Sequence, residues 1–338
     1  MKILKNVKQN TIIILIITLI TLYFALKDDF SNIVDILLKA DIKYILIALL
    51  FYFGYIFFKA YIIYYTANKK EDFTLKESIK HNIIIQFFNG ITPFSTGGQP
   101  MEVYMLSKHN ISITHSTNII VENFMFYQIA LVIYGLVAVL YNYFFGIFPN
   151  IPIMRKLVLA GFITNTFVAI VLFLVAFSPA FTRKCLKVIV DFFNKIHLIK
   201  NKEKFYAKWS DKLTEFHERT KNLKKQKKLF ALGIFYNLIS LTCFYIIPLF
   251  IAYSFHDFNN LTIMNTLTAS AYVLITGSFI PIPGASGGIE YSFLTFFSSF
   301  IVHNKVNVAL MLIWRFITYY LGMIVGAIMF NFDKGGKK

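Results

Sequence analysis

Residues 43–66 read KYILIALLFYFGYIFFKAYIIYYT, an apolar stretch with no acidic residue and a single lysine, Lys59, in its interior. A helix needs about 20 predominantly apolar residues to cross the hydrocarbon core of a bilayer. This stretch is long enough to do so, and it decides the class of the chain. The sequence predicts an all-α integral membrane protein.

The same pattern recurs along the 338 residues, of which 57% are hydrophobic and 15% are charged. Soluble domains typically carry about 25% charged residues. The N-terminal run resembles a signal peptide but lacks a small-residue cleavage site, so we interpret it as a retained span. We treat 1–338 as a single polytopic membrane domain. About six full spans are predicted, at 10–26, 43–66, 117–145, 156–178, 229–254 and 306–331.

Positive charge sets the orientation of these spans. The basic N-terminus, the 67–80 loop, the 181–228 segment and the tail should all be cytoplasmic, which places both termini inside. Segment 181–228 carries fifteen Lys/Arg and five Asp/Glu, a net charge of +10. We interpret it as a cytoplasmic loop of one or two amphipathic helices beside anionic lipid headgroups. Nucleic-acid binding is the less favoured alternative, because no recognisable module is present.

Two further apolar regions, 81–106 and 261–300, are interrupted by proline and glycine. Counting membrane crossings between the basic loops places both ends of the first region in the cytoplasm. It places both ends of the second region at the outer face. Both are therefore predicted to be hairpins that enter the membrane from opposite faces. The first is too short for two crossings, whereas the second is either re-entrant or two full spans, giving six to eight spans in total. Inverted, broken hairpins are typical of a transporter site near the midplane.

The two interruptions share a pattern. Residues 89–102 read NGITPFSTGGQPME, and residues 281–290 read PIPGASGGIE. Non-helical backbone at membrane depth is tolerated only where it is buried in protein or lines a wet cavity. The N–H groups at the start of a following helix favour an anion such as a phosphate. Kinks in packed helices are the plain alternative, but two matched breaks favour a substrate site.

Ionisable side chains inside spans point to the same kind of site, since each costs at least about 2.5 kcal/mol unless it is paired or hydrated. Arg315 lies well inside the last predicted span. It is interpreted either as a ligand for a phosphate or as the partner of Glu290 or Glu122 in an ion pair. Lys59 is interpreted as a residue that snorkels to the interface.

We collect these positions into one candidate site for a lipid headgroup. Its members are Thr92, Pro93, Ser95, Gly97, Gly98, Gln99, Glu102, Glu122, Pro283, Gly284, Ser286, Gly287, Gly288, Glu290, Arg315 and Tyr319. Gly322 and Gly326 are interpreted as helix-packing positions. No catalytic residue and no cofactor is predicted. His81, His109 and His303 show no metal-ligand spacing, so no metal site is expected.

At these motifs the chain resembles the family of the lysylphosphatidylglycerol synthase transmembrane region, which is related to the flippase half of the multiple peptide resistance factor. The resemblance rests on TPFSTGGQP at 92–100, PIPGASGGIE at 281–290 and WRFITYYLG at 314–322, in that order. Many members carry a basic residue just after the first Gly-Gly. Glu102 lies there in this chain, which puts an anion contact from that position in doubt.

The resemblance implies a multi-pass protein of the bacterial cytoplasmic membrane. It implies a flippase-like translocase for phospholipids such as aminoacylated phosphatidylglycerol, a role linked to antibiotic resistance. Bifunctional relatives add a soluble domain that transfers lysine to the lipid. This chain stops at Lys338, directly after its last span, so enzyme activity is not expected from it.

Two alternative functions stay open. One is phosphatidylglycerol lysyltransferase activity, which the family name suggests, and the other is a structural or regulatory role in the membrane. The expected partners are anionic or aminoacylated membrane lipids, with no nucleic acid. Assembly into a homo-oligomer is left open.

Overall fold

The computed structural model describes residues 35–67, 73–148, 151–195, 201–225, 227–278, 280 and 282–332. The predicted span at 10–26, part of the 67–80 loop and the basic tail lie outside these residues. The described part of the chain is helical, and its only β-pairing is an isolated antiparallel bridge between Phe258 and Ile301. The predicted all-α fold class is confirmed.

Five helical segments of the described chain are long and apolar enough to cross a membrane. They are α3 (Ile42–Thr66), α6 (Ile113–Phe145), α7 (Pro152–Phe177), α10 (Lys227–Tyr245) with α11 (Ile247–Phe255), and α14 (Asn304–Arg315) with α15 (Leu321–Phe332). Each coincides with a predicted span to within four residues at either end. Between α14 and α15 the backbone makes a π-helical turn, η3 (Phe316–Tyr320).

Polar caps determine where the long helices begin and end. Asp41 Oδ1 accepts a hydrogen bond from Lys43 N at 2.9 Å, and Ser112 Oγ accepts one from His115 N at 3.2 Å. These caps satisfy N–H groups that have no partner within the helix. Gly146 ends α6 with a left-handed φ of 57°, a conformation that glycine adopts without a Cβ penalty.

Two shorter helix pairs occupy the interrupted regions. Helices α4 (Leu75–Gly90) and α5 (Gly98–Ser107) flank the 3-10 turn η1 (Pro93–Ser95). Helices α12 (Ile263–Gly277) and α13 (Gly288–Phe297) flank the 3-10 turn η2 (Pro283–Ala285). Even the 16-residue α4 rises only about 24 Å, less than the roughly 30 Å of a hydrocarbon core. None of these helices is long enough to span the core by itself, which favours the re-entrant form for both regions.

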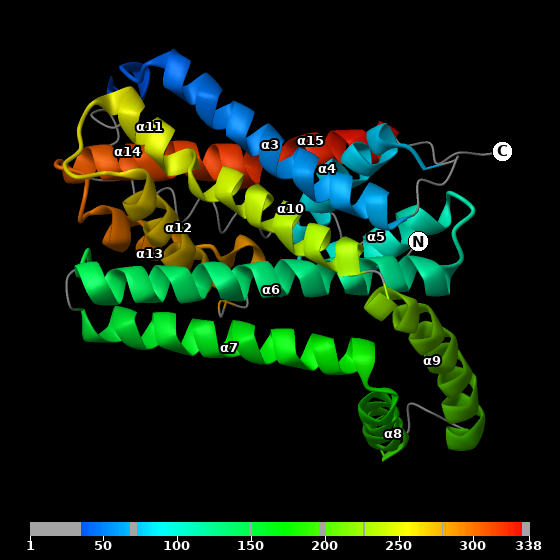
Figure 1. Ribbon diagram of the computed structural model, residues 1–338. Coiled ribbons are helices and arrows are strands. Elements are labelled where there is room, and N and C mark those ends of the chain that lie inside the picture. Colours follow the sequence, from blue (N-terminus) through cyan, green and yellow to red (C-terminus); the bar gives the residue numbers. More distant parts are fainter. Residues whose placement is uncertain are drawn as a thin grey trace.

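The two hairpins enter the bundle from opposite ends (Figure 1). The α4–α5 hairpin begins and finishes at the end that carries α8 (Pro179–Lys195) and α9 (Lys202–Lys225), which we call the basic end. The α12–α13 hairpin begins and finishes at the other end. There His303 Nδ1 lies 2.8 Å from Asp257 Oδ1 and joins the loops on either side of this hairpin. The inverted arrangement agrees with the counted crossings.

The basic segment folds as two helices, α8 and α9, that pack against each other. Asn118 Nδ2, near the start of α6, donates a hydrogen bond to Phe216 O of α9 at 3.0 Å. Helix α8 is amphipathic and leaves Val188, Ile189 and Phe192 exposed. This form agrees with the predicted amphipathic helices.

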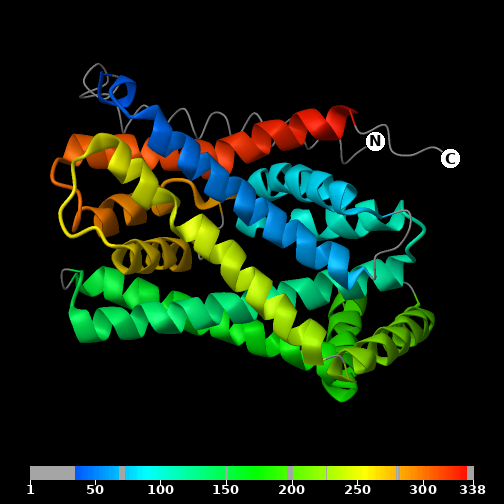
Figure 2. The ribbon, with the colours of Figure 1, turned by 45° about the horizontal axis from the view of Figure 1, so that its top comes forward.

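The packed core lies where α3, α10, α12, α13 and α14 meet. Tyr52, Tyr245 and Phe293 are almost fully buried there. Helix α3 runs alongside α10 for most of its length (Figure 2). Helix α7 lies at the outside, where Ile163 and Phe167 are about two-thirds exposed. Such exposed apolar surface on a long helix suits contact with lipid.

Candidate functional site

The tips of the two hairpins meet inside the bundle, where η1 packs directly against η2. Tyr319 of η3 contacts both hairpins, because its hydroxyl donates to Gly90 O at 2.9 Å and its ring lies against Gly284. The backbone of both tips leaves helical geometry: φ is 53° at Phe94 and Ser95 and 64° at Gly284. Irregular backbone from two distant parts of the sequence is therefore gathered at one place.

A cavity of about 490 Å³ adjoins the meeting point, within the usual size range of small-molecule sites. Amide side chains line part of it, namely Asn82, Gln86, Asn89, Gln99, Asn123, Gln128, Asn165 and Asn237. Apolar side chains line the rest, among them Ile62, Ile85, Phe124, Leu131, Val168 and Leu274. The lining residues Phe94, Ser95 and Thr96 are exposed, so the cavity is open at the hairpin tips. A cavity lined by both polar and apolar side chains suits an amphiphilic ligand.

A buried ion pair supports the second tip. Arg315 Nε lies 2.7 Å from Glu290 Oε1, and the two side chains are only 5% and 10% exposed. Glu290 Oε2 accepts a hydrogen bond from Gly287 N at 2.7 Å, while Arg315 Nη2 donates to Gly284 O at 2.9 Å. The guanidinium also lies 4.4 Å from the centre of the Tyr319 ring. Of the alternatives proposed for Arg315, the structure shows the ion pair with Glu290.

The backbone N–H groups of three Gly-Gly residues are bonded within the protein. Gly97 N donates to Thr92 Oγ1 at 2.8 Å, and Gly98 N donates to Asn89 Oδ1 at 3.0 Å. Gly287 N is bonded to the carboxylate of the buried ion pair. The sequence analysis expected such groups to bind a phosphate. In this conformation an anion must first displace their side-chain acceptors.

Comparison with known proteins gives this architecture a family. The chain matches the family described as the lysylphosphatidylglycerol synthase TM region over residues 11–326, a range that includes both hairpins and Arg315. The chain belongs to this family. The resemblance inferred from three short motifs is thereby confirmed.

The chain is also similar to a UPF0104 membrane protein of Archaeoglobus fulgidus. The two are 25% identical over 264 residues, which is 76% of each chain. Together with the five apolar segments, the family match establishes a multi-pass membrane protein.

Fifteen of the sixteen predicted site residues fall into two groups within this family architecture. Those that line the cavity are Ser95, Gln99, Glu102, Gly284, Arg315 and Tyr319. Those that lie in or beside the hairpin turns without lining it are Thr92, Pro93, Gly97, Gly98, Pro283, Ser286, Gly287, Gly288 and Glu290. Glu122 is buried on α6, outside the cavity lining and apart from the ion pair.

Lys59 lines the cavity, although the sequence analysis assigned it to the membrane interface. Its Nζ lies 3.3 Å from the hydroxyl of Tyr55 and 5.2 Å from the centre of the Tyr127 ring. Glu102 lines the same cavity. Lys59 is seven residues from the end of α3 at Thr66, and at that depth an ammonium group needs polar surroundings. That position in the sequence was the signal that could have identified it.

Gly284→Ala should lower the free energy of unfolding by about 2–4 kcal/mol. The loss combines the strain of a positive φ with a steric overlap. An added Cβ would collide with the ring of Tyr319. Thermal unfolding of the purified protein in detergent measures the change. In a Tyr319→Ala background the overlap disappears, and the cost should fall to about 1 kcal/mol. An equal cost in both backgrounds would show that the ring does not exclude a side chain at this position.

Proposed function

We propose that this protein moves membrane phospholipids between the leaflets of the bilayer, with aminoacylated phosphatidylglycerol as one candidate substrate. The observation that carries the proposal is the amphipathic cavity where two oppositely entering, broken hairpins meet. Transporters commonly hold their substrates between such discontinuous helices near the midplane. Membership of a family named for a lipid synthase supports a lipid as the substrate.

The charges of the cavity match a zwitterionic or aminoacylated headgroup. Lys59 and Arg315 supply cations for a phosphate, and Glu102 supplies a carboxylate for an ammonium group. Phe94 and Ile282, which are 56% and 37% exposed, line the open side of the cavity. Exposed apolar side chains at this depth give the acyl chains a route that stays in the bilayer while the headgroup is in the cavity.

The ion pair gives lipid binding a way to act on the second hairpin. Arg315 is bonded to both Glu290 and Gly284 in this conformation. A lipid phosphate in the cavity would compete with the carboxylate for the guanidinium, because planar guanidinium groups bind oxyanions with two parallel hydrogen bonds. Exchange of partners at Arg315 would then couple headgroup binding to movement of η2.

Closing the opening of the cavity should slow translocation. Thr96 lies on η1's C-terminal side, is exposed and lines the cavity, so Thr96→Trp should narrow the entrance. We expect the rate of leaflet exchange of fluorescent phosphatidylglycerol in proteoliposomes to fall roughly tenfold or more, equivalent to about 1.4 kcal/mol in the barrier. Quenching of the outer-leaflet fluorophore by a membrane-impermeant reductant measures the rate.

Ser298→Trp is the matched control, because Ser298 is exposed at the far end of the second hairpin and does not line the cavity. Its exchange rate should equal that of the wild type. Wild-type protein that exchanges lipid no faster than protein-free vesicles would contradict translocation. New lysyl-lipid in extracts of cells that express this chain alone would instead favour the lysyltransferase alternative.

A further inference from the structure

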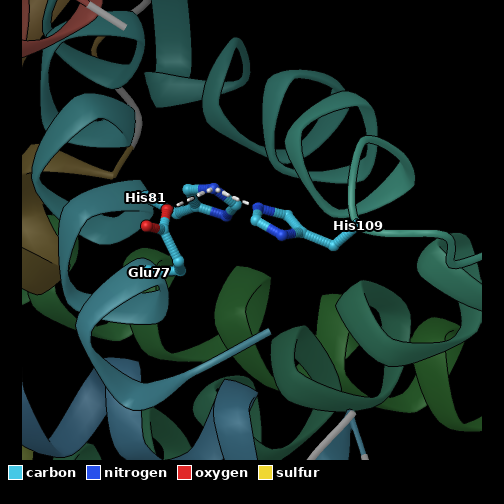
Figure 3. Close-up of side chains that lie close together, drawn as sticks. All are labelled: Glu77, His81 and His109. Carbon is cyan, nitrogen blue, oxygen red and sulfur yellow. Dashed lines mark hydrogen bonds and ion pairs between the residues drawn. The ribbon is translucent and has the colours of Figure 1, made fainter. Parts of the chain in front are cut away.

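Three potential metal ligands converge at the base of the first hairpin (Figure 3). Glu77 and His81 lie one turn apart on α4, and His109 follows the end of α5. Their ligand atoms all lie within 4.8 Å of one another. His81 Nε2 is 3.3 Å from His109 Nε2 and 4.0 Å from Glu77 Oε2. The cluster lies at the opposite end of the hairpin from η1, which borders the cavity.

The distance between the two ring nitrogens suits one small cation. Two ligands bound to zinc at about 2.05 Å in tetrahedral geometry lie about 3.3 Å apart. The oxygen of Glu77 is slightly too distant for this geometry, but its side chain is 36% exposed and has room to rotate toward the nitrogens. Lys80 Nζ lies 3.8 Å from the same oxygen, so a cation has to compete with a partly buried lysine for the carboxylate.

An aromatic ring packs against both imidazoles. Phe73 packs against both rings, at 5.5 Å from His81 and 5.4 Å from His109 between centroids. His81 is 5% exposed, so the cluster is closed to solvent on that side. A proton shared between the two imidazoles would bond only the two ring nitrogens and not the carboxylate of Glu77. A divalent cation binds both nitrogens and the carboxylate together.

We propose that Glu77, His81 and His109 bind one Zn²⁺ ion that fastens the base of the first hairpin. Two imidazoles and one carboxylate form a donor set that zinc accepts, whereas Mg²⁺ and Ca²⁺ prefer oxygen ligands alone. Three protein ligands leave a fourth position for water. No metal site was expected from the sequence, because no pair of histidines shows metal-ligand spacing with a carboxylate on one helix face. Glu77 and His81 do lie four residues apart on α4, and only the fold adds His109.

The bound ion would connect α4 to the end of α5 at the basic end of the bundle. Asn82, which lines the cavity, follows His81 directly, so the fastening would also position part of the cavity wall. Zinc binding does not depend on lipid translocation, and either can be present without the other.

Metal titration of the untagged, full-length protein in detergent, after removal of metals with a chelator, tests the site. The wild type should bind one Zn²⁺ per chain, and Zn²⁺ but not Mg²⁺ or Ca²⁺ should raise its Tm by several degrees. Co²⁺ in place of Zn²⁺ should give the visible absorption of a four-coordinate ion. The variants His109→Ala and Glu77→Gln should each lower the affinity for Zn²⁺ at least tenfold.

His303→Ala is the matched control, since it removes a histidine that pairs with a carboxylate, Asp257, at the opposite end of the bundle. Its Zn²⁺ affinity should equal that of the wild type. Wild-type protein without a stoichiometric Zn²⁺ site would overturn the proposal. So would full affinity in Glu77→Gln and His109→Ala, or loss of affinity in His303→Ala. Should His109→Ala fail to fold, Glu77→Gln, at a half-exposed position, decides the question.

Discussion

Replacing Arg315 with alanine should abolish lipid translocation and lower the free energy of unfolding by about 3–5 kcal/mol. The change leaves the carboxylate of Glu290 buried without its cation, at 10% exposure, and removes the donor to Gly284 O. It also takes away one of the two cations that line the cavity. Leaflet exchange in proteoliposomes and thermal unfolding in detergent measure the two effects.

A second variant separates stability from transport. Arg315→Met combined with Glu290→Gln leaves no unpaired charge at the second hairpin tip, so most of the lost stability should return. Translocation should stay absent, because the cavity still lacks the guanidinium of Arg315. Arg155→Ala, on the exposed first turn of α7, is the matched control and should change the free energy of unfolding by less than about 0.5 kcal/mol. A folded Arg315→Ala protein with wild-type exchange rates would exclude Arg315 from the transport site.

Gly326→Val should separate α15 from α4 and lower the free energy of unfolding by about 2–4 kcal/mol. A Cβ at Gly326 would lie 2.5 Å from the carbonyl oxygen of Ile83 and 3.1 Å from the Cβ of Phe87. Backbone atoms of a packed helix cannot move aside as the end of a side chain can. Because α4 carries Asn82, Gln86 and Asn89, the same displacement should also reduce lipid exchange.

The control for this prediction lies two residues away. Ile324 is exposed on the same helix, so Ile324→Val removes one methylene from a surface suited to lipid and should change the midpoint of thermal unfolding very little. Equal midpoints for Gly326→Val and Ile324→Val would show that α15 and α4 tolerate a wider separation. The interpretation of Gly326 as a packing position would then be wrong.

Much of the architecture was predictable because lipid imposes simple requirements on a sequence. The five long segments were found from their length and lack of charge, since only a helix of about 20 apolar residues satisfies its backbone across the bilayer. The two interruptions were found because Pro93 and Pro283 cannot continue a helix. The basic loops then dictated, by counting, that the hairpins enter from opposite ends.

The contents of the site were less predictable, because they depend on side-chain contacts that hydrophobicity and charge along the chain do not specify. Lys59 was assigned to the interface, yet it lines the cavity with Glu102 and lies beside Tyr55 and Tyr127. The Gly97 N–H group was expected to bind an anion, yet it donates a hydrogen bond to Thr92 Oγ1. Tyr55 and Lys59 are four residues apart on α3, but no spacing along the chain relates them to Tyr127 or Glu102.

By itself, the sequence determined that this is a multi-span membrane protein of its family, where its helices break and that the breaks enter from opposite sides. Those properties follow from local hydrophobicity, local charge and backbone chemistry, each of which depends on residues that are neighbours in the sequence. Only the tertiary structure decided that η1 and η2 touch, that Arg315 pairs with Glu290 instead of Glu122, and that His109 joins Glu77 and His81. Such contacts depend on how whole helices pack, and packing is set by the summed shape of many side chains.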